Sequence, residues 1–317
     1  MKPDASFVMR FAADLDALVP PNQRIGLAVS GGPDSLALLL LAAASRPGLI
    51  AAATVDHGLR PESRAEAEMV GSVCAGLGAP HTLLQADWID PPEVNLQAEA
   101  RTMRYRLLGD WAEKNDLRAV ATAHHADDQA ETLLMRLARG SGVRGLGGAR
   151  TRRKLTEAVT LVRPLLGWRK SELASIVDHA GLNPVDDPSN RDPRHDRSRI
   201  RQVLERAEWA DPARLAASAA ALRDADEALD WALAPLIAAR IRREDDALVI
   251  EPFDLPRELK RRLLAAAFAE MGVPSPRGPE LMRAMDSLEA DRTVTLSGLK
   301  LQGGNFWRLS LAPQRRG

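Results

Sequence analysis

The chain has 317 residues and a mass of 34.4 kDa, so two domains of roughly 150 residues each are the simplest expectation. Hydrophobic residues make up 45% of the sequence and charged residues 27%, which is enough for a packed core and argues against a disordered chain. The formal net charge is zero, the longest apolar run has nine residues against the ~20 of a membrane span, and one cysteine excludes an intrachain disulfide. We therefore expect a soluble, cytoplasmic protein with no membrane partner.

The first half of the chain alternates short apolar runs with longer segments of helical periodicity. Such alternation favours an α/β fold in which helices cover both faces of a parallel sheet. The predicted strands are 24–29, 49–55, 81–84 and 119–123, and 159–162 is a candidate fifth strand. The predicted helices are 36–44, 63–76, 95–114, 131–138 and 171–180.

The pattern changes after residue 206, and we expect a domain boundary there, between 1–206 and 207–317. Asp211-Pro212 is a typical helix start, and it opens a long alanine-rich helix. Two further helices, 258–271 and 279–289, precede two apolar runs, 293–296 and 306–311, around Gly303-Gly304. This predicts a smaller, mainly helical C-terminal domain that ends in a short β-hairpin.

The zero net charge hides a basic segment. Residues 136–206 contain sixteen arginines and lysines against eight acidic residues. Local charge of this kind attracts phosphate backbones, but a solvated surface balanced by a neighbouring domain explains it equally well.

The turn after the first predicted strand is a candidate anion site. The string SGGPDS (30–35) joins that strand directly to a helix. Glycines allow a close approach to a ligand, and the helix N-terminus turns unpaired N–H groups toward it. The Walker pattern GxxxxGK[ST] is absent, and a purely structural turn is the alternative. Asp34 within this turn suits a site where a divalent cation lies between carboxylate and phosphate.

Polar residues also follow the second and fourth predicted strands, where open α/β sheets bind ligands. Asp56 and His57 end the second strand, and the fourth leads into HHADDQAET (124–132). The alternative for this second string is a helix start with Asp127 as its cap. Histidines beside carboxylates also suggest zinc, but the HExxH spacing is missing and Mg²⁺ fits a phosphate site better.

Five strings in this order resemble the tRNA(Ile)-lysidine synthetase family of PP-loop ATP pyrophosphatases. They are SGGPDS, VDHGLRPES, NLQAEARTMRYRLL, AHHADDQAETLLMRLARGSGVRGLGG and DDPSNRDPRHDRSRIR, and the resemblance covers essentially the whole of residues 24–206. The resemblance implies ATP-dependent ligation of L-lysine to C2 of the wobble cytidine in the CAU anticodon of isoleucine tRNA, through an adenylated cytidine. The implied product is lysidine, and pyrophosphate and AMP are released.

The resemblance also suggests roles for individual residues. The implied catalytic residues are Asp34, Asp127, Asp128, Glu131 and Arg104, of which Asp34 and Asp127 are candidates for Mg²⁺, while Asp128 and Glu131 are candidates for the lysine ammonium. ATP would contact Ala28, Ser30, Gly31, Gly32, Pro33, Asp34, Ser35, Asp56 and His57. The implied tRNA contacts are Arg191, Arg194, Arg197, Arg199 and Arg201, with Arg197 or Arg201 reaching into the active site. A homodimer is possible.

Several alternatives remain open at this level. Arg101 and Arg104, one helical turn apart, either stabilise phosphate charge or lie on an ordinary amphipathic surface, and Tyr105 is expected to pack. The arginines of 191–206 either contact tRNA or pair with acidic residues at a domain junction. The rival functions are another PP-loop tRNA modification, by thiolation or amidation, and a non-enzymatic ATP sensor. Thiolation routes lean on several cysteines, which this sequence lacks.

Overall fold

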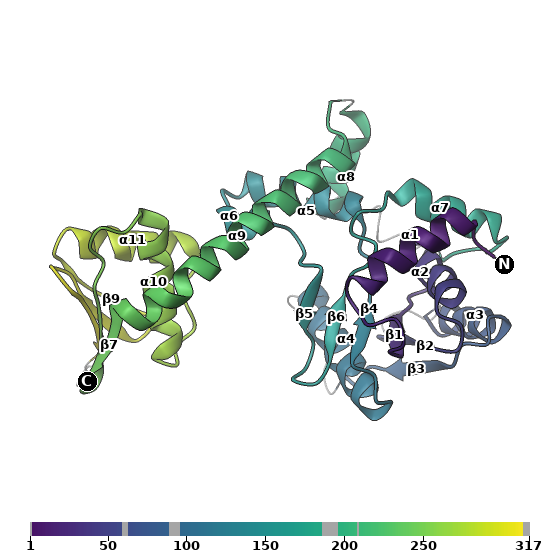
Figure 1. The fold of residues 1–317 in the computed structure, drawn as a ribbon, viewed down its shortest axis with the longest axis horizontal. Helices are drawn as coiled ribbons and strands as arrows, with labels where there is room; N and C mark the ends of the chain where they lie inside the picture. The colour runs from purple at the N-terminus through teal and green to yellow at the C-terminus, as the bar shows by residue number, and fades with distance from the viewer. Residues whose placement is uncertain (1, 59–62, 89–95, 186–195, 208, 313–317) are drawn as a thin grey trace. The chain divides into compact units, whose positions relative to one another are not determined.

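The computed structural model describes residues 2–58, 63–88, 96–185, 196–207 and 209–312 (Figure 1). Contacts divide the chain into two compact units, Met1–Ala221 and Leu222–Gly317. The division falls inside helix α9 (Pro212–Arg240), later than the change of sequence pattern at residue 206. The functional assignment of the two parts stays a prediction. None of the helices in the described ranges is long and apolar enough to cross a membrane.

The N-terminal unit is built on a six-stranded sheet with the strand order β3-β2-β1-β4-β6-β5. Pairing is parallel from β3 through β6, and β5 runs antiparallel to β6. The strands are β1 (Ile25–Ala28), β2 (Ile50–Asp56), β3 (His81–Gln85), β4 (Ala119–Ala121), β5 (Arg152–Lys154) and β6 (Thr160–Val162). The predicted parallel sheet and its fifth strand are therefore confirmed, and β5 is an addition.

Helices cover both faces of this sheet, as predicted (Figure 1). One core contains side chains of α1 (Ala5–Asp16), α2 (Pro33–Ser45), α3 (Ser63–Gly76) and α7 (Lys170–His179). The core on the other face contains Leu108 and Trp111 of α4 (Leu96–Lys114). Helix α2 is apolar nearly all round and is buried from Ser35 through Ala42, which is typical of a central core helix.

Three more helices, α5 (Ala126–Ala138), α6 (Val143–Leu146) and α8 (Asp196–Arg206), come after β4 in the chain and pack together. Helix α5 contacts both α6 and α8. Because β4 ends at Ala121 and α5 begins five residues later, the N-terminus of α5 lies at the carboxyl end of the sheet.

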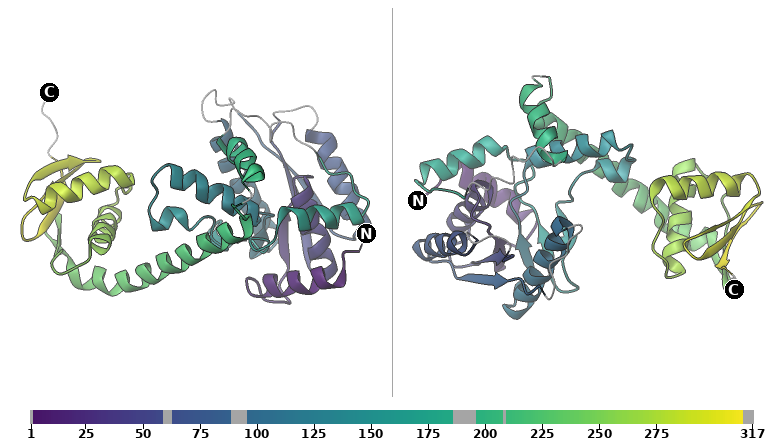
Figure 2. Two further views of the ribbon diagram at one scale, coloured as in Figure 1. Left: turned by 90° about the horizontal axis from the view of Figure 1, so that it is seen from above. Right: turned by 180° about the vertical axis from the view of Figure 1, so that it is seen from behind.

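The C-terminal unit has its own core under a five-stranded antiparallel sheet with the order β7-β8-β11-β10-β9 (Figure 2). Its strands are β7 (Ile241–Glu244), β8 (Ala247–Ile250), β9 (Thr293–Leu296), β10 (Leu299–Gln302) and β11 (Trp307–Leu311). Alternate strand residues pack against α9, α10 (Arg257–Glu270) and α11 (Gly278–Glu289). The buried Arg262 joins α10 to α9 through ion pairs with Asp226 and Asp230.

One detail of the predicted hairpin is wrong. The runs 293–296 and 306–311 do not pair with each other, because β10 lies between β9 and β11 and pairs with both. Gly303-Gly304 therefore connects β10 to β11. Residues 299–302 alternate between buried and half-buried positions, which is typical of a strand with one covered face.

Candidate active site

The loop between β1 and α2 is held in shape by its own hydroxyl groups. Ser35 Oγ accepts the backbone N–H of Ser30 at 3.1 Å and donates to the carbonyl of Gly32 at 2.9 Å. Gly31 has φ +86°, and a Cβ at that position would approach Val185 to 2.9 Å. No side chain caps α2 at Gly32. The first turn of α2 therefore offers the positive end of a helix to an anion.

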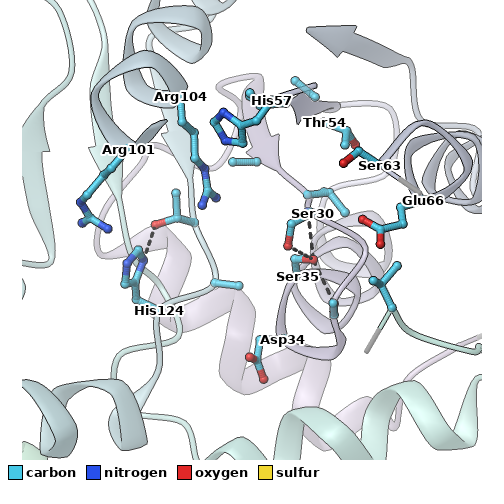
Figure 3. Close-up of a pocket in the computed structure, with 18 of the residues that line it drawn as sticks. Ser30, Asp34, Ser35, Thr54, His57, Ser63, Glu66, Arg101, Arg104 and His124 are labelled. Atoms are coloured by element: carbon cyan, nitrogen blue, oxygen red, sulfur yellow. Dashed lines mark hydrogen bonds between the residues drawn. The ribbon is translucent and has the colours of Figure 1, made fainter. Parts of the chain in front are cut away.

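This loop forms one wall of a cavity of about 700 Å³ at the carboxyl ends of β1, β2 and β4 (Figure 3). The cavity brings together residues from the ends of these three strands and from helices α2, α3, α4, α5 and α8. Among the expected site residues, Ala28, Ser30, Gly32, Pro33, Asp34, Ser35, His57, Arg104, Asp128 and Arg197 line it. Gly31, Asp56, Asp127, Glu131, Arg199 and Arg201 are not among its lining residues. Arg191 and Arg194 lie outside the described residues.

The end of β2 turns the ring of His57 toward the cavity. The buried carboxylate of Asp56 is used locally, since it accepts the backbone N–H of Gly58 at 2.8 Å. Trp88 donates its indole N–H to the carbonyl of His57 at 2.8 Å. Burial and the nearby charge of Arg104 hold the pKa of His57 below its usual value, so the imidazole is neutral at neutral pH. A neutral ring against an apolar strand end suits a nucleobase.

His125, and not Asp127, caps helix α5. The buried His125 accepts the backbone N–H of Asp128 at Nδ1, and the Asp128 carboxylate accepts the backbone N–H of His125 in return. The Nε2 atom of His125 lies 3.4 Å from Asp34 Oδ2. Burial lowers the pKa of His125, but the hydrogen bond to Asp34 and the charges of the three surrounding aspartates raise it above its usual value. His125 thus connects the loop of α2 to the start of α5.

The two candidate Mg²⁺ ligands differ in how their oxygens are engaged. Asp127 pairs with Arg169 at 3.2 Å and accepts the backbone N–H of Lys170 at 2.8 Å, so it fixes the start of α7. Asp34 Oδ1 is buried without a hydrogen-bond partner among the described residues. In the same part of the chain, no three histidine, cysteine or acidic side chains form a ready-made metal site. Asp34 alone therefore offers a free oxygen, which fits an ion bound by one or two carboxylates together with phosphate.

Helix α8 brings two arginines onto the carboxylates of α5. Arg197 Nε lies 2.7 Å from Glu131 and its Nη2 lies 3.2 Å from Asp128, while Arg201 Nε binds the second oxygen of Glu131 at 2.7 Å. Glu131 is only 3% exposed. Burial raises the pKa of Asp128, but the charges of His125 and Arg197 hold it below its usual value. Asp128 is therefore charged, and of the two carboxylates only Asp128 lines the cavity.

The opposite end of the cavity is basic. Arg101 and Arg104 line it from α4, next to His124 (Figure 3). His124 is hydrogen-bonded to Thr122 at 3.0 Å, and burial lowers its pKa to about 3. It is therefore a neutral side chain between charged groups.

Some of these contacts have no signal in the sequence. Arg169 meets Asp127 across 42 positions, and His125 meets Asp34 across 91 positions of the chain. The spacing of Arg101, Arg104 and Tyr105 at i, i+3 and i+4 does place these three on one helix face, and it is the one local pattern that points to the basic end.

Comparisons with known proteins agree with this geometry. A family model described as a PP-loop domain matches residues 6–208. A tRNA(Ile)-lysidine synthase of Novosphingobium aromaticivorans is 47% identical over 97% of this chain and 94% of its own length. A tRNA(Ile)-lysidine synthase of Zymomonas mobilis subsp. mobilis is 43% identical over 94% of this chain and 91% of its own length.

Among solved structures, a U34-tRNA thiolase from Methanococcus maripaludis with a [4Fe-4S] cluster has a TM-score of 0.56 at 17% identity, over 68% of this chain and 76% of its own. At this low identity the likeness concerns the fold alone. The cavity, the loop of α2 and the near-complete alignment with the two synthases lead to one conclusion: the chain is a member of the tRNA(Ile)-lysidine synthase family and contains its ATP-using PP-loop domain.

Proposed function

We propose that the protein ligates L-lysine to C2 of the wobble cytidine in the CAU anticodon of isoleucine tRNA. ATP is the co-substrate, an adenylated cytidine is the intermediate, and pyrophosphate and AMP are released in turn. The observation that carries the proposal is a cavity lined by the α2 loop, by Asp128 and by three arginines, Arg101, Arg104 and Arg197. One cavity then holds a site for ATP, a site for an ammonium group and a cationic wall.

In the first step the C2 oxygen of cytidine attacks the α-phosphorus of ATP. The bond to the bridging oxygen breaks and pyrophosphate leaves. Ser30, Gly31, Gly32, Pro33 and Ser35 would bind the phosphates with hydroxyl and backbone N–H groups, and His57 and Ala28 would contact adenosine. Arg104, half-buried at the cavity wall, would stabilise the charge that develops on phosphate. Asp56 would hold the segment around His57 in place for this contact, because its carboxylate accepts a hydrogen bond from the backbone N–H of Gly58.

Asp34 would hold Mg²⁺, with Asp127 as the second candidate. The buried free oxygen of Asp34 supports this assignment, whereas Asp127 would have to exchange its contact with Arg169. A bound Mg²⁺ supplies positive charge against the departing pyrophosphate.

In the second step the ε-amine of lysine, after loss of a proton, attacks C2 of the adenylated base. The C2–N bond forms, the C2–O bond to AMP breaks, and AMP leaves. Asp128 is best placed to receive the ammonium, since it is charged and lines the cavity. Glu131 would act through Arg197 and Arg201, because both of its oxygens already bind these arginines.

The tRNA partner is assigned to the basic segment and to the C-terminal unit. Arg199 is exposed, and its one ion pair among the described residues is the local one with Asp196, so it is available to phosphate. Arg197 lines the cavity, and Arg201 binds Glu131, the carboxylate that Arg197 also contacts. A homodimer and a cytoplasmic location complete the proposal.

Thiolation is disfavoured by the single cysteine. Cys74 is buried in the core of α3, and burial raises the pKa of its thiol to about 11, so it is not a nucleophile at neutral pH. Neither the ligand-binding end of the sheet nor the cavity lining includes it.

The experiment that tests the proposal separates the two steps. Protein, ATP, Mg²⁺ and isoleucine tRNA without lysine are expected to release pyrophosphate only, up to one equivalent of active sites. Addition of lysine is then expected to release AMP and restart pyrophosphate release. Pyrophosphate formation that needs no tRNA, or AMP formation that needs no lysine, would contradict the proposed order.

A further inference from the structure

A cluster of arginines surrounds Tyr105 behind the basic end of the cavity. The guanidinium carbon of Arg101 lies 5.0 Å from the centroid of the Tyr105 ring, and that of Arg153 lies 4.1 Å from it. Arg104 and Arg163 complete this group, which we call the tyrosine-centred cluster. Burial raises the pKa of Tyr105, but the four positive charges together hold it below its usual value.

No carboxylate of the described residues pairs with any of these four arginines. Arg163 is 4% exposed, it donates to the backbone carbonyl of Arg150 at 2.6 Å, and its Nε has no partner among the described residues. The contrast with Arg197 and Arg201 is clear, since both bind Glu131. Arg163 is buried, Arg104 is half-buried, and Arg101 and Arg153 are exposed. Four positive charges around one ring, with no carboxylate paired to them among the described residues, favour an anionic ligand.

The cavity separates this anion site from the one at the α2 loop. Figure 3 places Arg101, Arg104 and His124 at one end and Ser30 and Ser35 at the other. His124 lies within electrostatic reach of Asp128 as well as of Arg101, Arg104 and Arg163. A carboxylate and a set of arginines therefore flank one neutral imidazole. That arrangement matches a zwitterion that carries an ammonium group and a carboxylate on one chain.

We propose that Arg101 binds the α-carboxylate of the amino-acid substrate, and that Tyr105, with Arg153 and Arg163 behind it, positions Arg101 for this contact. The inference rests on the proposed function and adds to it a basis for substrate specificity. The protein accepts an α-amino acid and rejects a plain diamine of the same length, which has the reacting amine but no carboxylate.

The test compares lysine with 1,5-diaminopentane as the nucleophile in AMP release from adenylated isoleucine tRNA. The wild-type protein is expected to prefer lysine by roughly 10- to 100-fold in kcat/KM, the usual range for a lost hydrogen bond between charged groups. Arg101→Gln is expected to raise KM for lysine by a similar factor and to leave the diamine, the KM for ATP and lysine-independent pyrophosphate release unchanged. The selectivity ratio then falls close to one.

Tyr105 is tested by two substitutions and a matched control. Tyr105→Leu removes the ring under Arg101 and is expected to behave like Arg101→Gln, while Tyr105→Phe keeps the ring and most of the selectivity. Arg106→Gln, an exposed neighbour on the same helix that does not line the cavity, is expected to match wild type in both nucleophiles. Arg101 is exposed, so Arg101→Gln stays informative even if Tyr105→Leu unfolds.

Three results would overturn the inference. One is an equal loss of rate with lysine and diamine in Arg101→Gln. Another is unchanged lysine KM with a weaker salt dependence of tRNA binding, which would assign Arg101 to an RNA phosphate. A third is a wild-type protein that shows no preference for lysine. Absence of lysine-dependent AMP release in the wild type would instead contradict the proposed function itself.

Discussion

At the scale of single residues, the site depends on which carboxylate oxygens are already engaged. Asp34 keeps one buried oxygen free, Asp128 lines the cavity beside Arg197, and Asp127 is turned toward Arg169 and α7. These differences assign different tasks to residues that look equivalent in the sequence. They are tested by substitutions that keep shape and change charge.

Asp127→Asn tests the second magnesium ligand. The amide oxygen can still accept the backbone N–H of Lys170, so the protein is expected to fold. If Asp127 holds Mg²⁺ beside Asp34, the rate of pyrophosphate release should fall by about 100-fold or more, as after loss of one electrostatic stabiliser. Asp34→Asn provides the reference loss. If Asp127→Asn released pyrophosphate at nearly the wild-type rate, Asp127 would serve only to hold the start of α7 in place.

At the scale of elements, one buried carboxylate, Glu131, binds two arginines where α5 contacts α8. Glu131→Gln keeps the volume but removes the charge that binds Arg197 and Arg201. Since both arginines are partly exposed, we expect a loss of roughly 2 kcal/mol in the free energy of unfolding, at the low end for charged hydrogen bonds. Thermal unfolding measures it, with Glu205→Gln at an exposed position of α8 as control. An unchanged unfolding temperature would mean that α8 is held by other contacts.

Helix α3 contributes packing, and its cysteine tests the nature of the nucleophile. Cys74→Ala removes a small buried side chain and is expected to cost about 1 kcal/mol of stability. Lysine-dependent AMP release on isoleucine tRNA should stay close to wild type, because attack by an amine needs no thiol. If turnover disappeared in a variant with a normal unfolding temperature, a thiol would be part of the chemistry.

At the scale of the whole molecule, local charge matters more than net charge. The chain is neutral overall, yet residues 136–206 carry twice as many basic as acidic side chains. Replacement of Arg191, Arg194 and Arg199 with alanine is expected to weaken tRNA binding and to lower the slope of log K against log salt by about 0.7–0.9 for each lost phosphate contact. Titrations at several salt concentrations measure this, and ATP binding should not change. An unchanged slope would return these arginines to a structural role.

The sequence predicts the framework well and the contacts between distant segments poorly. Apolar runs such as 119–123 and the GGP turn before α2 carry their own local signals, and the structure confirms the strands and helices that they predict. Strand β5 consists of Arg152, Arg153 and Lys154, and only pairing with β6 makes it a strand. The pairing of Glu131 with Arg201 across 70 positions likewise depends on the packing of α8 against α5.

Because contacts between distant segments cannot be predicted from the sequence, the carboxylates of the site could be identified there, but their separate roles could not. The string HHADDQAET predicts a polar cluster. In the folded protein His125 caps α5 and contacts Asp34, whereas Asp127 binds the start of α7, and these contacts exist only once the sheet has formed. Residues that are far apart in the sequence show no regular spacing from which their contact could be predicted. The tyrosine-centred cluster is similar, because Arg153 and Arg163 reach Tyr105 from β5 and from the end of β6.

The most direct test of the central claim locates the transferred group in the RNA. Protein, ATP, Mg²⁺, isoleucine tRNA with the CAU anticodon and labelled lysine are incubated, and the tRNA is digested to nucleosides. The account predicts one label per tRNA, on the wobble cytidine alone, with one AMP and one pyrophosphate formed for each label. Label elsewhere in the RNA, or ATP cleavage with an unlabelled wobble cytidine, would contradict it.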